Sequence, residues 1–179
     1  MIITVTQFGA AKSQLIEAIK LFFEERDPVS IHTLVGASLN ILHDHIKSID
    51  TAWKTQLVLD YRTLCIKEKD RKIWANKVRD SRNFFKHAEK NIKQGRWDID
   101  FDTDMNHFYI MESIICFGGL EGKNFVCPPE MALFIGWFVL KYPDVVNEAL
   151  AVYSKGISHI DPTDFQFFKK VLRACLESF

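Results

Sequence analysis

Polar and charged side chains recur along residues 76–87 at a spacing that gathers them on one side of a helix. At about 100° per residue, Asn83 and His87 are neighbours four positions apart, and Asn76, Arg79 and Asp80 lie one or two turns earlier. Histidine can accept or donate a proton near neutral pH, and a guanidinium can stabilise negative charge on a phosphate. These residue types predict acid–base chemistry on an RNA 2′-hydroxyl that needs no metal ion.

The charge around this segment favours a polyanionic ligand. Residues 62–96 contain twelve Lys or Arg and four Asp or Glu, a local balance of +8 in a chain whose formal net charge is zero. A basic helix of this kind can bind phosphates, with Lys86, Arg79 and Asn76 as substrate-binding residues. The alternative is a solvated helix face that the four aspartates at 98–104 neutralise.

The block Arg82-Asn83-Phe84-Phe85-Lys86-His87 resembles the Arg-x4–6-His motif of HEPN proteins (higher eukaryotes and prokaryotes nucleotide-binding). The resemblance implies an all-helical, dimeric protein, and many members are metal-independent endoribonucleases of toxin–antitoxin and phage-defence systems. It implies Arg82 and His87 as catalytic residues, assisted by Asn83, in a site formed by two copies. The blocks 31–34 and 83–88 are also similar to a group of short bacterial proteins with no assigned activity.

Arg82 and His87 differ by about 140° in direction on an ideal helix, since they are five positions apart. The two side chains can therefore serve one site by long side-chain reach, by a distortion of the helix, or by contributions from two subunits.

A second polar stripe, His32, Asn40 and His43, is predicted on the helix that follows Asp27-Pro28. It can form a shared polar cleft with the 76–87 stripe, in which His32 or His43 supplies a second proton-transfer group. The alternative is that these histidines are partly buried and hydrogen-bonded. Metal binding by residues 43–45 is disfavoured because adjacent helical side chains diverge, so neither a metal nor a cofactor is predicted.

The hydrophobic periodicity predicts helix almost throughout, in an all-α bundle of about seven to eight helices. We expect one domain spanning 1–179, with a HEPN-like four-helix core at 11–118 and a C-terminal helical extension at 128–179. Residues 97–102 alternate apolar and polar residues, and we interpret them as an extended connector rather than a strand. Gly118, Gly119 and Gly122 predict a loop. The expected helices are 12–25, 28–48, 52–65, 66–93, 103–117, 129–142, 143–156 and a last helix from Asp161-Pro162.

The composition of the 179-residue chain excludes several classes of protein. Zero net charge excludes a globally basic nucleic-acid-binding domain, and no apolar run reaches the 18 residues of a membrane helix. The four cysteines are widely spaced, which favours reduced core residues over a disulfide framework or a zinc site. With no secretory signal, we expect a soluble cytoplasmic protein. The phenylalanines near the C-terminus are expected in the core, or else at a partner surface.

Two functions remain open. The first is a HEPN-like, homodimeric protein that binds RNA or a protein partner such as an antitoxin, with metal-independent endoribonuclease as its candidate activity. The second is a non-enzymatic helical protein that binds a partner or a small ligand. Exposure of His87 in an open cleft favours the first function, and its burial behind Phe84 and Phe85 favours the second.

Overall fold

The computed structural model describes residues 2–49, 80–81, 83–144 and 152–177, and within these residues it contains helices and no strand. The all-α fold predicted from the sequence is therefore confirmed. The helix predicted at 52–65 lies outside the described residues. So does most of the one predicted at 143–156, whose described end holds one turn of 3₁₀ helix, η2 (Val152–Ser154).

The first two helices form a hairpin, and a side-chain hydrogen bond caps the start of each helix. The helix α1 (Gln7–Phe23) begins where the Thr6 hydroxyl accepts a hydrogen bond from the Gly9 amide at 2.9 Å. The helix α2 (Pro28–Ser48) begins where the Asp27 carboxylate accepts one from the Ser30 amide at 2.8 Å. Asp27 caps the helix and Pro28 opens it, as the sequence predicted, because proline needs no amide partner in a first turn.

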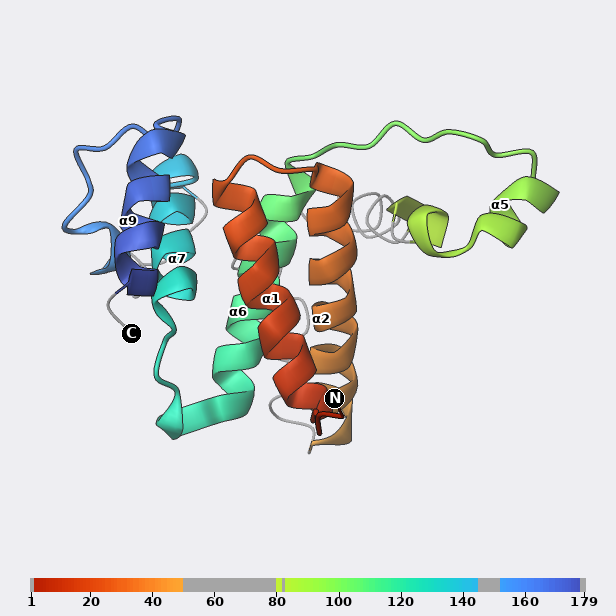
Figure 1. Cartoon of the computed structure of the whole chain (residues 1–179), viewed down its shortest axis with the longest axis horizontal. Helices are drawn as coiled ribbons and strands as arrows, with labels where there is room; N and C mark the ends of the chain where they lie inside the picture. Colours follow the sequence, from red (N-terminus) through yellow and green to blue (C-terminus); the bar gives the residue numbers. More distant parts are fainter. Residues whose placement is uncertain (1, 50–79, 82, 145–151, 178–179) are drawn as a thin grey trace.

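Among the described residues, α1 and four further helices pack together in a bundle (Figure 1). The helix α1 packs against α2, α6 (Met105–Glu121), α7 (Pro129–Lys141) and α9 (Phe165–Glu177). The helices α7 and α9 lie together at one side of α1, and α2 lies at the other. The short helix α5 (Ala88–Lys93) lies outside the bundle on the α2 side, and an extended segment leads from it back to α6.

Aromatic side chains fill the space between α1, α7 and α9, which explains why the chain is rich in phenylalanine. Phe22 makes edge-to-face contacts with Trp137, Phe134 and Phe165 at ring-centroid distances of 4.7, 5.3 and 5.4 Å. Phe168 is fully buried and stacks on Phe23. The C-terminal phenylalanines that the structure describes thus belong to the core and its margin.

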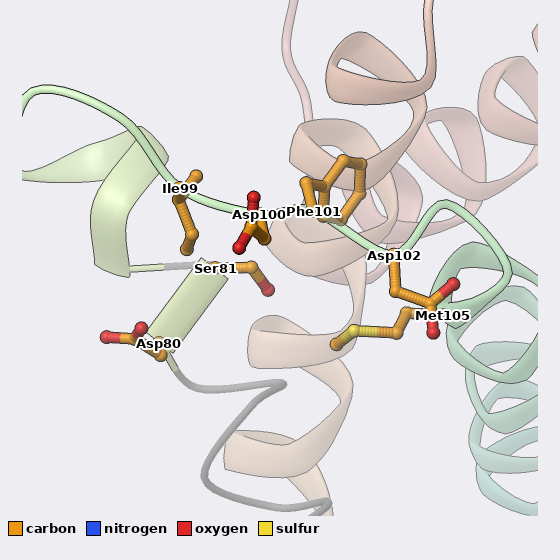
Figure 2. A pocket seen from close by; sticks show the side chains of 7 residues that line it. All are labelled: Asp80, Ser81, Ile99, Asp100, Phe101, Asp102 and Met105. Carbon is orange, nitrogen blue, oxygen red and sulfur yellow. The ribbon is translucent and has the colours of Figure 1, made fainter.

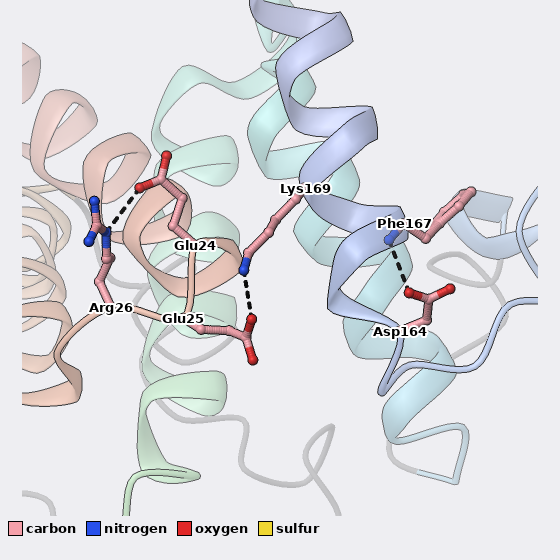
Figure 3. Close-up of polar contacts among 6 residues, drawn as sticks. All are labelled: Glu24, Glu25, Arg26, Asp164, Phe167 and Lys169. Carbon is pink, nitrogen blue, oxygen red and sulfur yellow. Dashed lines mark hydrogen bonds and ion pairs between the residues drawn. The ribbon is translucent and has the colours of Figure 1, made fainter.

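A polar contact also ties α9 to the end of α1 (Figure 3). Glu25 follows α1 in a left-handed conformation, with φ of 53°, and its carboxylate accepts a hydrogen bond from Lys169 Nζ at 2.6 Å. Asp164 caps α9 by accepting a bond from the Phe167 amide at 3.1 Å. The last helix therefore begins at Phe165, later than predicted, because Asp161 Oδ1 accepts bonds from both the amide and the hydroxyl of Thr163 in a separate turn.

Two other predictions, the connector and the glycine loop, have different outcomes. Residues 97–102 form an extended connector, as predicted. The loop predicted at Gly118 and Gly119 is wrong, because α6 continues to Glu121 and ends at Gly122, whose φ is 63°. A helix tolerates interior glycines at about 1 kcal/mol each, whereas its end needs a residue that accepts positive φ.

The described cysteines are free thiols. Cys116 is buried, and Cys127 and Cys175 are half-buried. Burial raises the pKa of the Cys116 thiol, which keeps it protonated and inert. Cys65 lies outside the described residues.

Candidate functional site

The segment that contains the block 82–87 is interrupted at His87. Asp80, Ser81 and residues 83–86 are helical, His87 leaves the helix with φ of −125° and ψ of 67°, and α5 starts at Ala88. The prediction of one helix over 66–93 is therefore wrong in its described part. Asn83 and His87 remain linked, because the His87 amide donates to the Asn83 carbonyl at 3.0 Å.

Asn91 stabilises this interruption from the following helix. The break leaves the Phe84 carbonyl without its usual amide partner four residues later. The Asn91 side chain replaces that partner, since its Nδ2 donates to the Phe84 carbonyl at 2.7 Å, and Asn91 is buried. The Asn91 carbonyl in turn accepts the Arg96 amide at 2.9 Å, beyond the left-handed Gly95. No glycine or proline occurs at the break, so residue types alone could not predict that the helix ends at His87.

Arg96 holds the end of this unit to its beginning. Its guanidinium donates two hydrogen bonds of 2.8 Å to the Asp80 carboxylate, and it lies 5.5 Å from the centre of the Phe84 ring. The bond from Arg96 lowers the pKa of the Asp80 carboxyl, and the same bond raises the pKa of Arg96. This bidentate pair fixes the path of the chain after α5.

An open hollow of about 570 Å³ lies over the break. Its lining residues are Asn83, Lys86, His87, Ala88, Glu89 and Lys90. His87 and Lys86 are exposed and Asn83 is half-buried. The structure thus brings together three residues predicted for the site. The other three predicted there, Asn76, Arg79 and Arg82, lie outside the described residues.

His32 is buried between the bundle and the residues Ser81 and Phe101. Only 1% of it is exposed; its Nδ1 lies 2.9 Å from Asn106 Oδ1, and its Nε2 lies 3.2 Å from Ser81 Oγ. Asn106 is anchored by donating to the Pro28 carbonyl at 3.0 Å. The ring of Phe101 packs on the imidazole edge-to-face at 4.9 Å. Both ring nitrogens therefore have partners, as the alternative interpretation of this stripe expected.

The predicted cleft shared by the two stripes is not formed at His32. His32 contacts Ser81 and Phe85. At about 100° per residue these two side chains lie on the side of a helix opposite Asn83. Ala88 is exposed, and it follows the break of the helix at His87.

The other two residues of the α2 stripe are partly accessible. His43 Nε2 lies 3.1 Å from Glu112 Oε1 on α6, and the exposed fractions of the two side chains are 20% and 7%. Asn40 is half-buried one turn earlier. The pair between His43 and Glu112 joins α2 to α6 and satisfies a carboxylate that would otherwise be buried alone.

A second hollow, also of about 570 Å³, lies between the 80–81 turn and the start of α6. Figure 2 shows Met105 extending toward Ser81 across it, while the Asp80 carboxylate points away. The other residues that line it, Ile99, Phe101, Asp100 and Asp102, come from the connector. Its apolar floor and acidic rim contrast with the basic hollow around His87.

A polar pair that the sequence did not predict joins α6 to the end of α7. His107 Nδ1 lies 2.8 Å from the Tyr142 hydroxyl, and the imidazole packs edge-to-face on Trp137 at 4.8 Å. Burial lowers the pKa of His107 to about 4 and raises the pKa of Tyr142 to about 12. No spacing rule could reveal this pair, because 35 residues separate its members.

No protein-family model, curated protein or solved structure matches the chain. The HEPN resemblance therefore stays a prediction that rests on its motif. In the described part of the chain, no helix is long and apolar enough to span a membrane. In the same residues, no group of three or more His, Cys, Asp or Glu side chains is arranged to hold a metal ion.

Proposed function

We propose that this protein binds RNA at the hollow around His87 and cleaves it without a metal ion. The observation that supports the proposal most directly is the exposure of His87 in an open hollow that also contains Asn83, Lys86 and Lys90. Burial behind Phe84 and Phe85 would have blocked access to substrate. The lysines provide positive charge for phosphates, which dominate the affinity of proteins for nucleic acids.

In the proposed reaction, His87 accepts the proton of a ribose 2′-hydroxyl, and the 2′-oxygen attacks the adjacent phosphorus. The bond from phosphorus to the 5′-oxygen breaks, and that oxygen takes a proton as it leaves. The products are a 2′,3′-cyclic phosphate and a 5′-hydroxyl. Arg82 keeps the role that the resemblance implies, which is to stabilise charge on the phosphate, and Asn83 orients His87 or the substrate.

The leaving 5′-oxygen needs a proton donor, and His32 and His43 are hydrogen-bonded within the bundle. The proposal therefore includes a homodimer in which the second copy supplies this group, as the resemblance implies. It also places the protein in the cytoplasm, where RNA and a protein partner such as an antitoxin are available.

The test is incubation of the purified protein with single-stranded and structured RNA in EDTA, beside His87→Ala and Arg82→Ala. We expect chelator-resistant cleavage that either substitution reduces by about 100-fold or more. The matched controls are His159→Ala and Arg173→Ala, which remove an exposed histidine and an exposed arginine elsewhere. Light scattering would measure whether the protein is a dimer.

The second candidate function is a non-enzymatic helical protein that binds a partner or a small ligand. The hydrogen bonds of His32 and His43 favour it, because they engage the groups that were expected to complete a catalytic site. Absence of cleavage, with wild type and both variants binding RNA equally weakly, would support this candidate over the ribonuclease.

A further inference from the structure

Trp97 is a large aromatic side chain on the surface just after α5. It is 74% exposed, whereas Trp137 in the bundle is 1% exposed. An indole is rarely left in water without a partner, because burying it gains a large hydrophobic free energy. Ile92 on α5, five positions earlier in the chain, is 53% exposed, so this part of the chain presents apolar as well as basic groups.

The backbone that carries Trp97 is held in place. Arg96 directly precedes it and is fixed by its two bonds to Asp80, its contact with the Phe84 ring and its amide bond to the Asn91 carbonyl. The helix α5 has six residues, so it is only about 9 Å long. Trp97 therefore lies at one end of a short helix, and the hollow around His87 lies at the other.

The charges of the exposed side chains differ on the two sides of Trp97. Lys86 and Lys90 line the hollow, and Lys93 is exposed between the hollow and Trp97, where it pairs with Glu89. The sign of the charge reverses at Asp98, in the acidic connector. A phosphate backbone is attracted along α5 and repelled beyond Trp97. Exposed aromatic rings beside basic side chains are typical of surfaces that bind single-stranded nucleic acid, where unpaired bases stack on the rings.

We infer that Trp97 is a base-stacking residue that selects single-stranded RNA over duplex RNA. This inference rests on the proposed function, because it extends the same site along α5. A base in a duplex already stacks on its neighbours and is not available to the indole, whereas a base in a single strand is. Trp97 therefore contributes to the affinity for single strands alone, while the lysines contribute to both.

The experiment measures binding of a short fluorescein-labelled 2′-O-methyl oligouridine in EDTA at low salt. The 2′-O-methyl group blocks cleavage, so that only affinity is observed. The same strand annealed to its complement serves as the duplex probe. We expect Trp97→Ala to weaken single-strand binding roughly tenfold, with little effect on the duplex. Trp97→Phe keeps a ring and should retain most of the affinity.

Two further variants make the result decisive. Val126→Ala removes another exposed apolar side chain, beyond the far end of α6, and should bind as wild type does. The double variant Lys86→Ala/Lys90→Ala should weaken both probes. Loss of binding in the lysine variant without any change in Trp97→Ala overturns the stacking role and leaves the proposed function standing. Equal weakening of both probes by Trp97→Ala also overturns it. A wild-type protein that binds neither probe overturns the proposed function itself.

Discussion

Histidine and tryptophan side chains are largely buried in the bundle but exposed in the segment 80–104. The bundle encloses most of His107, and it buries His32 together with Ser81 and Phe101 from the inner side of the segment. The segment 80–104 exposes His87 and Trp97, and it keeps its own internal bonds at Asn91 and Arg96. Surroundings rather than residue type therefore separate structural from functional candidates in this chain.

The two regions should respond differently to mutagenesis. Substitutions in the bundle should change the free energy of unfolding and leave RNA binding intact in the protein that remains folded. Exposed substitutions in the segment should do the reverse, because their side chains contribute little to packing.

The two tryptophans provide the largest contrast in stability. Trp137→Ala should lower the free energy of unfolding by about 4 kcal/mol, because it leaves a cavity among Phe22, Phe134 and Phe165. It also removes the bond that Trp137 Nε1 donates to the Pro162 carbonyl at 2.9 Å. Trp97→Ala should change stability by less than about 0.5 kcal/mol. Urea denaturation followed by circular dichroism measures both, and similar losses for the two variants would contradict the comparison.

His107 should make the bundle sensitive to acid. Burial lowers its pKa from 6.5 to about 4, against the opposing effects of Asp104 and Asp102 and with a smaller contribution from Lys141 in the same direction. Between pH 6.5 and about 4 the unfolded chain binds a proton at His107 that the folded chain does not bind. As far as His107 is concerned, the free energy of unfolding therefore keeps its full value above pH 6.5 and falls as the pH drops toward 4. The loss should approach about 3 kcal/mol.

Denaturation at a series of pH values measures this loss. His107→Gln cannot titrate, and it should be the less stable protein at neutral pH but should lose less stability on acidification. A variant with the same pH dependence as wild type would show that other groups control acid unfolding. The exposed control, His159→Ala, should leave the dependence unchanged.

The sequence predicted the bundle better than it predicted the site. Helix starts at Asp27-Pro28 and Pro129 follow from local rules, because a cap and a proline act on the nearest turn. The break at His87 depends on a hydrogen bond from Asn91 across seven residues, and no local rule favours it. The partners of His32 lie 49 and 74 residues away, at Ser81 and Asn106, so its burial could be stated from the sequence only as an alternative.

His32 and His87 test the comparison on one residue type. His32→Ala should lower the free energy of unfolding by about 2 kcal/mol, because Asn106 and Ser81 stay buried while each loses a hydrogen-bond partner. His87→Ala should lower it by less than about 0.5 kcal/mol, since His87 is exposed. Thermal unfolding separates the two variants. Equal destabilisation would mean that His87 supports the fold, and the proposed site would then lose its main argument.

Asn91 offers the closest test of how the break positions His87. Asn91→Ala removes the donor to the Phe84 carbonyl, which should cost about 1 kcal/mol. That carbonyl can then accept the Ala88 amide, and the helix would continue through His87 and turn its imidazole relative to Lys86 and Lys90. RNA cleavage should fall although the residues of the hollow are unchanged, and the NMR signals of the His87 ring should shift. The control, Gln94→Ala, removes an exposed amide from the same segment. Unchanged ring signals and cleavage in Asn91→Ala would show that the break does not position His87.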